Sequence, residues 1–463
     1  MIKTRTTVLD AVSRVGEEIL LKGWVRGRRD MGKIIFIDLR DRSGIMQVIC
    51  AAPEVVATAN QLRSEYAVAI RGLVKERSAK QINEKLPSGR VEVEALEVII
   101  INPAKTPPFE LDKDTRFVNE ETRLRYRYLD LRSERMLKNL ELRHRVIKFF
   151  RDFLSDRGFL EVETPILTKG TPEGAREFIV PSRLHAGKAY VLPQSPQQFK
   201  QLLMVAGVEK YFQVAKAFRD EDQRGDRQPE FTQLDIEMSF VEQEDILKLG
   251  EEMMNALIDA LNDAGGGYRV SKNPWPRLTY AEAMEKYKTD KPDLREDKNN
   301  PKELAFAWVV DFPMYEQDAE GALAAAHHPF TRPHSEDEHL LELDPLKVRA
   351  RSYDIVLNGY EISSGSIRIH ERELQNRIFK ILGLSQEEIN AKFGHMLEAF
   401  EYGAPPHGGF APGLDRLVMI LADEPNIREV MAFPKTGDAR DPMMGSPSLI
   451  GAKQMKDAHI KWT

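Results

Sequence analysis

The stretch from Phe218 to Phe240, FRDEDQRGDRQPEFTQLDIEMSF, contains ten formally charged side chains and then a regular alternation. From residue 231 onward, every second position is polar or aromatic, in the order Phe231, Gln233, Asp235, Glu237. A period of two predicts a β-strand with one apolar and one polar face. A solvated sheet face is the common alternative, but the aromatic ring inside the polar row argues against it.

The preceding strand, YFQVAKAFR, ends at Arg219, so a hairpin with a polar loop is expected. On its polar face Arg219 could bind a phosphate and Phe231 could stack on an adenine ring. Gln233 and Asp235 could bind a small polar ligand. Because the chain has no G-x-x-x-x-G-K-[ST] and no G-x-G-x-x-G after a strand, a nucleotide would be bound without a P-loop or dinucleotide fold.

A second segment, YDIVLNGYEISSGSIRIH, brings two carboxylates together. Asn358-Gly359 predicts a two-residue hairpin. The register then pairs Leu357 with Tyr360, Val356 with Glu361, and Ile355 with Ile362. Asp354 becomes a diagonal neighbour of Glu361, and two such oxygen ligands suit Mg²⁺ bound to nucleotide phosphates.

Arg368 lies seven residues after Glu361, so a regular strand would place the two on opposite faces. Both can serve one site only if the strand bulges near Ser363–Gly365, and we predict such a bulge.

Two further motifs add polar groups. The spacing of apolar residues in HGGFAPGLDRLVMIL predicts a helix from about Gly413, and Arg416 in its first turn could bind a phosphate. Gly-rich helix starts are frequent, so this motif is weak by itself. His327-His328 diverge as neighbours and lack zinc-ligand spacing, which favours contact with an anionic substrate or a structural role over a metal.

The first hundred residues predict the elements of a small β-barrel. Five strands are expected at 18–29, 33–40, 44–50, 66–77 and 90–101, with a helix at 53–63 between the third and fourth. This order is typical of a five-stranded oligonucleotide-binding barrel. Phe36 is expected either as a base-stacking platform, with Arg26, Arg28 and Arg29 near it for phosphates, or as barrel core.

The rest of the chain predicts an α+β domain, an antiparallel sheet flanked by helices. A Pro-rich and charged connector, 106–135, comes first, and a helix follows over about 134–156 with Gly158 as its C-cap. FLEVETPIL is a predicted strand in which Pro165 implies an edge or a bend. The most polar interval, 286–303, is a predicted surface loop.

Composition narrows the class of protein. The chain of 463 residues carries a net charge of −6 and one cysteine, Cys50, so disulfides within the chain are excluded. Residues 1–105 hold 18 Lys and Arg against 13 Asp and Glu, a basic module on an acidic body that is typical of polyanion binding. No segment is apolar enough for a membrane span or signal peptide, and a cytoplasmic location is expected.

Together these motifs resemble the class II aminoacyl-tRNA synthetases, and specifically their aspartyl branch in its bacterial form. FLEVETPIL resembles motif 1, the dimer-interface element, FRDED…RQPEFTQLDIE motif 2 and GLDRLVMIL motif 3. LPQSPQQFKQLL, AHHPF and TPEGAREF are similar to segments of the aspartyl branch. The resemblance implies an anticodon-binding barrel at 1–105, a hinge at 106–135 and a catalytic domain at 136–463. It also implies a cytoplasmic homodimer that uses ATP and Mg²⁺ to attach L-aspartate to the aspartate tRNA, with the asparagine tRNA as an open second acceptor.

The resemblance also assigns residues. It implies an ATP site formed by Arg219, Asp220, Glu221, Gln228, Phe231, Glu361, Gly413, Leu414, Asp415 and Arg416. It implies an aspartate site formed by Glu173, Gln197, Lys200, Arg219, Gln233, Asp235, His327, His328 and Arg368. Mg²⁺ would be bound by Asp354 and Glu361, and the anticodon by Arg29, Phe36 and Gln47. The catalytic residues would be Arg219, which holds the α-phosphate, Arg416, which holds the γ-phosphate, and Glu361, which acts through Mg²⁺.

The chain departs from the family pattern at two places. The domain that the bacterial form carries before WVVDFPMYE is reduced here to a short loop near 288–305. Ser363-Ser364 stand where the family has glycines, which puts the shape of the amino-acid pocket in question. Three alternatives stay open: an asparagine or lysine synthetase, a non-catalytic tRNA-binding paralogue, and an amide-forming ligase with the same adenylate chemistry.

Overall fold

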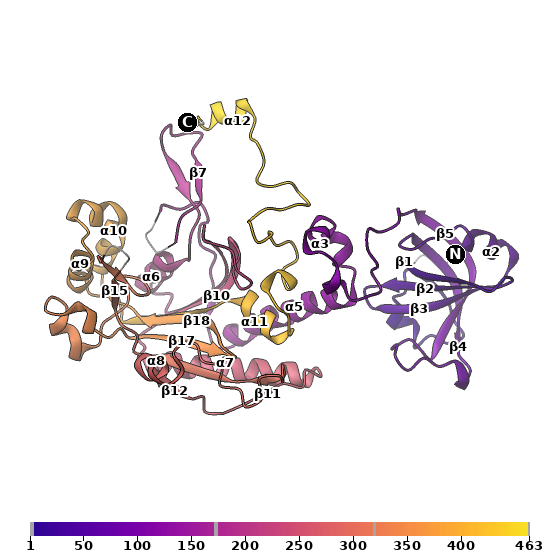
Figure 1. Ribbon diagram of the computed structural model, residues 1–463, viewed down its shortest axis with the longest axis horizontal. Helices are drawn as coiled ribbons and strands as arrows, with labels where there is room; N and C mark the ends of the chain where they lie inside the picture. The colour runs from indigo at the N-terminus through magenta and orange to yellow at the C-terminus, as the bar shows by residue number, and fades with distance from the viewer. Residues whose placement is uncertain (1–3, 171–174, 318–320, 462–463) are drawn as a thin grey trace. The chain divides into compact units, whose positions relative to one another are not determined.

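The computed structural model describes residues 4–170, 175–317 and 321–461. The chain divides into two compact units, Met1–Asn119 and Glu120–Thr463 (Figure 1). The predicted connector at 106–135 contains the boundary between them, since its second part is helical and belongs to unit 2. No helix in the described ranges is long and apolar enough to cross a membrane.

Unit 1 is a closed barrel with the strand order β1-β2-β3-β5-β4. Its strands are β1 (Glu18–Asp30), β2 (Ile35–Asp41), β3 (Gly44–Cys50), β4 (Ala67–Glu76) and β5 (Val91–Asn102). The short helices α1 (Val8–Ala11) and α2 (Pro53–Ala59) pack against the barrel core. Alternation explains the closure, because Ile35, Ile37 and Leu39 are fully buried while the residues between them face outward. The oligonucleotide-binding barrel is confirmed.

Unit 2 is built on an eight-stranded sheet with the order β12-β14-β17-β18-β19-β10-β9-β6. These strands are β6 (Leu160–Glu161), β9 (Lys210–Phe218), β10 (Glu230–Ser239), β12 (Arg277–Thr279), β14 (Phe306–Val310), β17 (Ser352–Leu357), β18 (Tyr360–Ile367) and β19 (His407–Pro412). The central strands pair antiparallel, as expected, whereas the two edge strands β12 and β6 pair parallel to their neighbours. Small ribbons are formed by β7 (Ile179–Pro181) with β8 (Ala189–Val191), β11 (Arg269–Val270) with β13 (Glu303–Leu304), and β15 (Tyr315–Gln317) with β16 (Leu323–Ala325).

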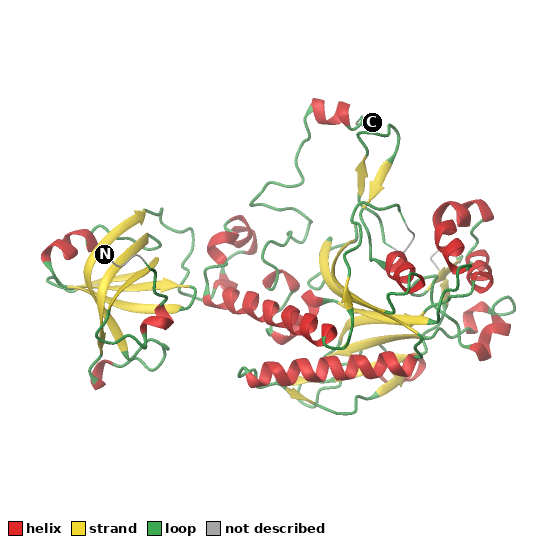
Figure 2. Ribbon diagram, turned by 180° about the vertical axis from the view of Figure 1, so that it is seen from behind, coloured by secondary structure: helices red, strands yellow, loops and turns green. Residues whose placement is uncertain are grey.

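Helices cover one face of this sheet and form the main core with it (Figure 2). The helices that supply this core are α5 (Glu134–Ser155), α7 (Gln243–Asp263) and α11 (Leu414–Leu421). Elsewhere unit 2 contains α3 (Glu120–Arg125), α4 (Arg127–Asp130), α6 (Gln197–Val205), α8 (Tyr280–Tyr287), α9 (Arg372–Ile381), α10 (Gln386–Phe400) and α12 (Ala452–Asp457). The other face of the central strands is therefore left for polar side chains.

Two sequence predictions need correction. FLEVETPIL is not a full strand, since only Leu160–Glu161 pair, at the sheet edge, and the chain leaves the ladder before Pro165. In the β17–β18 hairpin, Leu357 pairs with Tyr360 and Val356 with Glu361 as predicted. Ile355, however, pairs with Ser363 instead of Ile362, because β18 carries a bulge at this point.

Candidate active site

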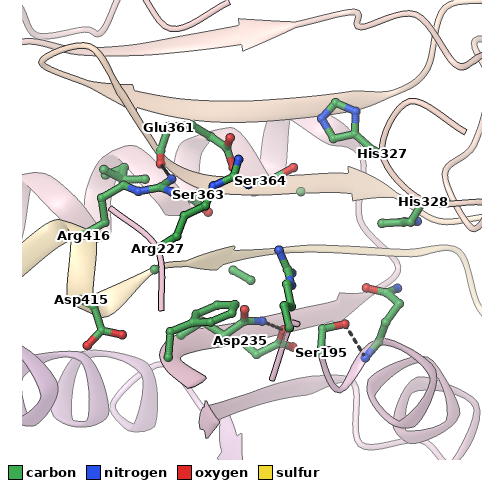
Figure 3. Close-up of a pocket in the computed structure, with 18 of the residues that line it drawn as sticks. Ser195, Arg227, Asp235, His327, His328, Glu361, Ser363, Ser364, Asp415 and Arg416 are labelled. Carbon is green, nitrogen blue, oxygen red and sulfur yellow. Dashed lines mark hydrogen bonds between the residues drawn. The ribbon is translucent and has the colours of Figure 1, made fainter. Parts of the chain in front are cut away.

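A polar cavity of about 370 Å³ lies over the polar face of the central strands (Figure 3). Its walls come from the β9–β10 hairpin, α6, the segment around residues 327–331, strand β18 and the start of α11. Fifteen residues of the predicted sites line it: Gln197, Lys200, Arg219, Glu221, Gln228, Phe231, Gln233, Asp235, His327, His328, Glu361, Gly413, Asp415, Arg416 and Arg368. The structure thus brings together motifs that lie up to 219 residues apart in the sequence.

The floor of the cavity is the polar row of β10, which is buried instead of solvated. Asp235 and Glu237 are both fully buried, and each lies beside a buried cation. Lys200 Nζ is 3.0 Å from Asp235 Oδ1 and 3.3 Å from Glu237 Oε2. The Gln233 amide also donates to Asp235 Oδ2 at 3.1 Å. A buried charge is costly unless it is paired, so these contacts explain why two carboxylates can occupy the floor.

Arg368 is the second buried cation, and its geometry is fully determined by neighbours. Its Nε donates to Glu237 Oε1 at 2.9 Å and its Nη2 to Glu237 Oε2 at 3.1 Å. Its Nη1 donates to Ser366 Oγ at 2.5 Å and lies 2.8 Å from His328 Nε2. The Phe330 N–H donates to Nδ1 of the same ring at 3.2 Å, and because a neutral imidazole has one acceptor nitrogen, the ring can accept from either Phe330 or Arg368 in a given tautomer.

The pKa values of this cluster follow from burial and charge. Burial acts to raise the pKa of Glu237, but Arg368 and Lys200 outweigh it and lower that pKa to about 2. Burial raises the pKa of Asp235, and Lys200 opposes that shift. Burial and the charge of Arg368 push the pKa of His328 well below its ordinary value, so the ring is neutral at physiological pH.

The bulge in β18 decides which residues face the cavity. Ser364 pairs with Asp354 and Ser366 with Ser352, so the even-numbered residues beyond the bulge share the face of Asp354. Before the bulge, Glu361 pairs with Val356 and shares that same face. The predicted condition for Glu361 and Arg368 to serve one site is therefore met, with the bulge at Ile362, one residue before the predicted segment.

Asp354 and Glu361 form the acidic corner of the site. Asp354 lies beside the cavity lining, and its buried Oδ1 has no hydrogen-bond partner among the described residues. Burial and the charge of Asp354 raise the pKa of Glu361. His327 Nε2 lies 3.6 Å from Asp354 Oδ1. Burial acts to lower the pKa of His327, but this contact with Asp354 raises it overall.

The two adjacent histidines therefore do different work. His327 faces the acidic corner, whereas His328 contacts Arg368, and Figure 3 shows both rings at the same side of the cavity. Adjacent side chains diverge, as the sequence predicted, and no cluster of three or more metal-binding side chains occurs in the part of the chain that the structure describes.

Two further arginines, Arg219 and Arg416, line the cavity. The Arg219 guanidinium lies 5.1 Å from the centre of the Phe231 ring, and its buried Nε has no hydrogen-bond partner among the described residues. Arg416 donates to the backbone carbonyl of Glu361 and, at 3.0 Å, to Asp226 Oδ2. Both cations retain donor capacity toward the cavity.

Some predicted residues are placed differently. Leu414 is buried in the core, and Asp220 is not part of the cavity lining. Gln228 lines the cavity, but its amide exchanges two hydrogen bonds with the Lys435 backbone. Asp415 accepts from the Thr232 N–H at 2.7 Å and from Arg143 at 2.5 Å, so its carboxylate holds β10 against α5. Glu173 lies outside the described residues.

Several cavity residues were not predicted. They are Ser195, Asp226, Arg227, Thr331, Ile362, Ser363, Ser364, Gly365, Ala411 and Ile427. Asp226 and Arg227 belong to the charged loop of the β9–β10 hairpin, so their charge was a signal that could have found them. Glu237 stands in the polar row, yet its pairing with Arg368 depends on a contact between residues 131 positions apart.

The barrel of unit 1 carries its own polar patch. Phe36 is absent from the barrel core and half-buried on the outer face of β2. Arg29 lies 6.0 Å from the centre of its ring and donates to Gln47 Oε1 at 2.9 Å. Arg29 also pairs with Asp38 at 3.0 Å. The three residues predicted for the anticodon thus lie next to one another on three neighbouring strands.

Comparison with known proteins agrees with this geometry. Residues 119–437 match the family of class II tRNA synthetases (D, K and N), and residues 19–101 match the OB-fold nucleic acid binding domain. The chain belongs to the class II tRNA synthetases. Among curated synthetases, it is 43% identical to the aspartate–tRNA(Asp/Asn) ligase of Rubrobacter xylanophilus, over 99% of this chain and 96% of that one. It is 42% identical to the aspartate–tRNA ligase of Geobacillus kaustophilus, over 96% of each chain.

Solved synthetases share the fold. The aspartyl-tRNA synthetase of Entamoeba histolytica superposes with a TM-score of 0.74 at 23% identity, covering 93% of this chain and 91% of that one. The asparaginyl-tRNA synthetase of Pyrococcus horikoshii, complexed with asparaginyl-adenylate, gives a TM-score of 0.75 at 23% identity, covering 94% and 99%. The alignment with the Rubrobacter synthetase runs over 584 residues against 463 in this chain, so that relative holds more than a hundred residues that are missing here.

Proposed function

We propose that this synthetase activates L-aspartate with ATP and transfers the aspartyl group to the 3′ end of the aspartate tRNA. One observation carries the proposal: two buried cations, Lys200 and Arg368, lie in the same cavity as Arg219, Arg416 and the acidic corner. The first pair suits a substrate with an anionic side chain, and the second pair suits the phosphates of ATP. The curated relatives named as aspartate–tRNA ligases support the same substrate.

The chemistry needs positioning and charge neutralisation but no nucleophilic side chain. An α-carboxylate oxygen of aspartate attacks the α-phosphorus of ATP, the bond to pyrophosphate breaks, and aspartyl-adenylate forms. A terminal ribose hydroxyl of the tRNA then attacks the activated carbonyl carbon, and AMP leaves. Arg219 would neutralise charge on the α-phosphate and Arg416 on the γ-phosphate.

The remaining residues bind and orient the two substrates. Phe231 provides a flat ring for the adenine, on the side of the cavity that holds Arg219. Asp235 and Gln233, at the floor, suit the ammonium group of the amino acid, with Gln197 near it. His328 packs beside Arg368, with its Nε2 2.8 Å from the guanidinium. A lysine side chain would meet two buried cations, which argues against a lysine synthetase.

A Mg²⁺ ion fits the acidic corner. Asp354 Oδ1 is buried and has no hydrogen-bond partner among the described residues, and Glu361 lines the same cavity as Arg219 and Arg416. Because only two carboxylates meet there, the ion would need phosphate oxygens and waters as further ligands, which is the usual arrangement for Mg²⁺. When bound, such an ion neutralises phosphate charge and orients the leaving pyrophosphate.

The barrel would select the tRNA. Phe36 offers a stacking surface for an anticodon base, and Arg29 and Gln47 offer hydrogen bonds beside it. Some curated relatives are named as ligases for the aspartate tRNA alone, and others for both the aspartate and asparagine tRNAs. Both kinds match the chain at nearly equal identity, so the asparagine tRNA stays open as a second acceptor. Exposed Met31, in the loop between β1 and β2, favours the strict type.

The enzyme would act in the cytoplasm as a homodimer. The segment that begins with β6 leaves Leu160, Ile166 and Leu167 about half exposed at the sheet edge. Apolar side chains on an edge strand are a natural surface for a second copy of the chain. Sedimentation of the purified protein, with Leu160→Asp as the disrupting variant, would test this assembly.

The decisive experiment is charging with radiolabelled aspartate on two tRNA transcripts, with anticodons GUC and GUU. Charging of GUC alone would show a strict enzyme, and charging of both would show a relaxed one. Pyrophosphate exchange that depends on aspartate, and not on asparagine or lysine, would establish the amino acid. If neither exchange nor charging occurs with aspartate, the proposed function is refuted.

A further inference from the structure

Strand β18 presents a hydroxyl to the cavity at a position between the acidic corner and the buried arginine. Ser364 pairs with Asp354 across the β17–β18 ladder and lies beyond the bulge at Ile362. Paired residues in an antiparallel ladder project to the same face, so Ser364 shares the face of Asp354. Its side chain is half-buried and lines the cavity (Figure 3).

The Ser364 hydroxyl forms no hydrogen bond within the described part of the chain. The next hydroxyl on the same face, Ser366 Oγ, accepts from Arg368 at 2.5 Å and from Thr331 at 3.2 Å. By contrast, the Ser364 hydroxyl makes no hydrogen bond to any residue that the structure describes. A polar group that lines a cavity without a protein partner is available to a ligand.

The neighbouring serine provides a contrast. Ser363 pairs with Ile355, whose side chain belongs to the core beneath the sheet. Its hydroxyl is buried and has no hydrogen-bond partner among the described residues, although Ser363 is one of the residues that line the cavity. The two adjacent serines therefore project to opposite faces of β18, and only Ser364 presents its hydroxyl to the substrates.

We infer that Ser364 positions the reacting α-carboxylate of the amino acid, an inference that rests on the proposed function. The Arg368 guanidinium reaches back along β18 to Ser366. Ser364 lies two residues further, about 6.6 Å along an extended strand. A four-carbon amino acid whose side-chain carboxylate is bound by Arg368 spans this distance and brings its α-carboxylate to Ser364. The hydroxyl then donates to the carboxylate oxygen that does not attack the phosphorus.

The test is aspartate-dependent pyrophosphate exchange by the full chain with Ser364→Ala, Ser364→Thr and Ser363→Ala. Ser364→Ala should lower kcat/KM for aspartate by roughly 10-fold or more, the loss expected for one hydrogen bond to a charged group, and leave KM for ATP unchanged. Ser364→Thr retains the hydroxyl and should recover most of the rate. Ser363→Ala should lower kcat/KM for aspartate far less than Ser364→Ala, because Ser363 pairs with Ile355 and projects to the opposite face of the strand.

The outcomes separate this inference from the proposed function. A wild-type enzyme without aspartate-dependent exchange refutes the proposed function itself. An active wild type with an equally active Ser364→Ala variant overturns only the role of Ser364. An equal loss in Ser363→Ala and Ser364→Ala would also overturn it, because the effect would then come from strand packing. Thermal melting of each variant checks that the fold is retained, and Ser364→Gly provides a second deletion if the alanine variant melts early.

Discussion

Arg219→Ala should separate catalysis from folding more cleanly than any other change in the cavity. Arg219 begins the loop of the β9–β10 hairpin, and its backbone N–H donates to the Pro229 carbonyl at 2.9 Å, a contact that alanine keeps. Its side chain forms no ion pair with the described residues and only faces the Phe231 ring at 5.1 Å. The guanidinium is thus held for a ligand and contributes little to the fold.

The expected loss in catalysis is larger than the expected loss in stability. A contact between a cation and an aromatic ring contributes about 0.5–1 kcal/mol when it is exposed and roughly 2 kcal/mol when it is desolvated, so for the half-buried Arg219 the free energy of unfolding should fall by no more than about 2 kcal/mol. A preorganised donor that stabilises developing charge contributes about 2.7–4 kcal/mol to the transition state, a factor of roughly 10²–10³ in kcat. Arg219→Ala should therefore lose at least about 100-fold in pyrophosphate exchange, while its free energy of unfolding falls by no more than about 2 kcal/mol.

The assay pairs exchange kinetics with urea unfolding, and Arg277→Ala serves as the control. Arg277 pairs with Glu244 on the surface, outside the cavity, and its side chain is 43% exposed. Loss of such a surface pair costs between 0 and about 1 kcal/mol, and exchange should be unchanged. An Arg219→Ala enzyme that keeps exchange within about threefold of the wild type would refute the assignment of this arginine to the α-phosphate.

Three further predictions concern the metal corner, acid stability and the barrel. Glu361→Gln should raise the Mg²⁺ concentration needed for half-maximal pyrophosphate exchange. The free energy of unfolding should stay equal or rise, because burial and the charge of Asp354 already raise the pKa of Glu361. A variant that unfolds at a lower urea concentration than the wild type would contradict this. Burial acts to raise the pKa of Glu429, but Arg123 and Arg135 lower it from 4.5 to about 2. That depressed pKa stabilises the fold above about pH 4.5, and on the order of 3 kcal/mol of the free energy of unfolding should be lost as the pH falls toward 2. The loss can be measured as a fall in the urea midpoint with pH, and this fall should be smaller in the Glu429→Gln variant. Phe36→Ala should raise KM for tRNA about 10- to 100-fold by removing one stacked base, while exchange without tRNA stays unchanged.

Local pattern was sufficient for most elements of the fold. The barrel strands follow the predicted ranges closely, because alternation alone decides which face of each short strand is buried. The Asn358-Gly359 turn was also predictable, since both residues adopt positive φ, 51° and 86°, which this residue pair tolerates. The prediction that FLEVETPIL forms a full strand was wrong. An apolar segment at a sheet edge has the composition of a strand but lacks strands on both sides to pair with.

The site was predictable in its residues but less so in their contacts. Fifteen cavity residues could be assigned in advance, some from the chemistry of phosphate and carboxylate binding and the others only from the resemblance to the class II synthetases. Gln228 and Asp415 were assigned to ATP from the motif, yet their polar atoms bind the Lys435 backbone, the Thr232 N–H and Arg143. These hydrogen bonds join segments that lie far apart in the sequence, so the local spacing of residues does not predict them.

The amino-acid sequence by itself determined which reactive and binding side chains this protein has, and on which face of a regular strand each residue lies. Only the tertiary structure decided which partners the buried Arg368 has, Glu237 and His328, and where the bulged residue lies that brings Arg368 to the face of Glu361. The physical reason is that a strand period is local, whereas burial of a charge requires a partner whose position depends on the packing of the whole domain.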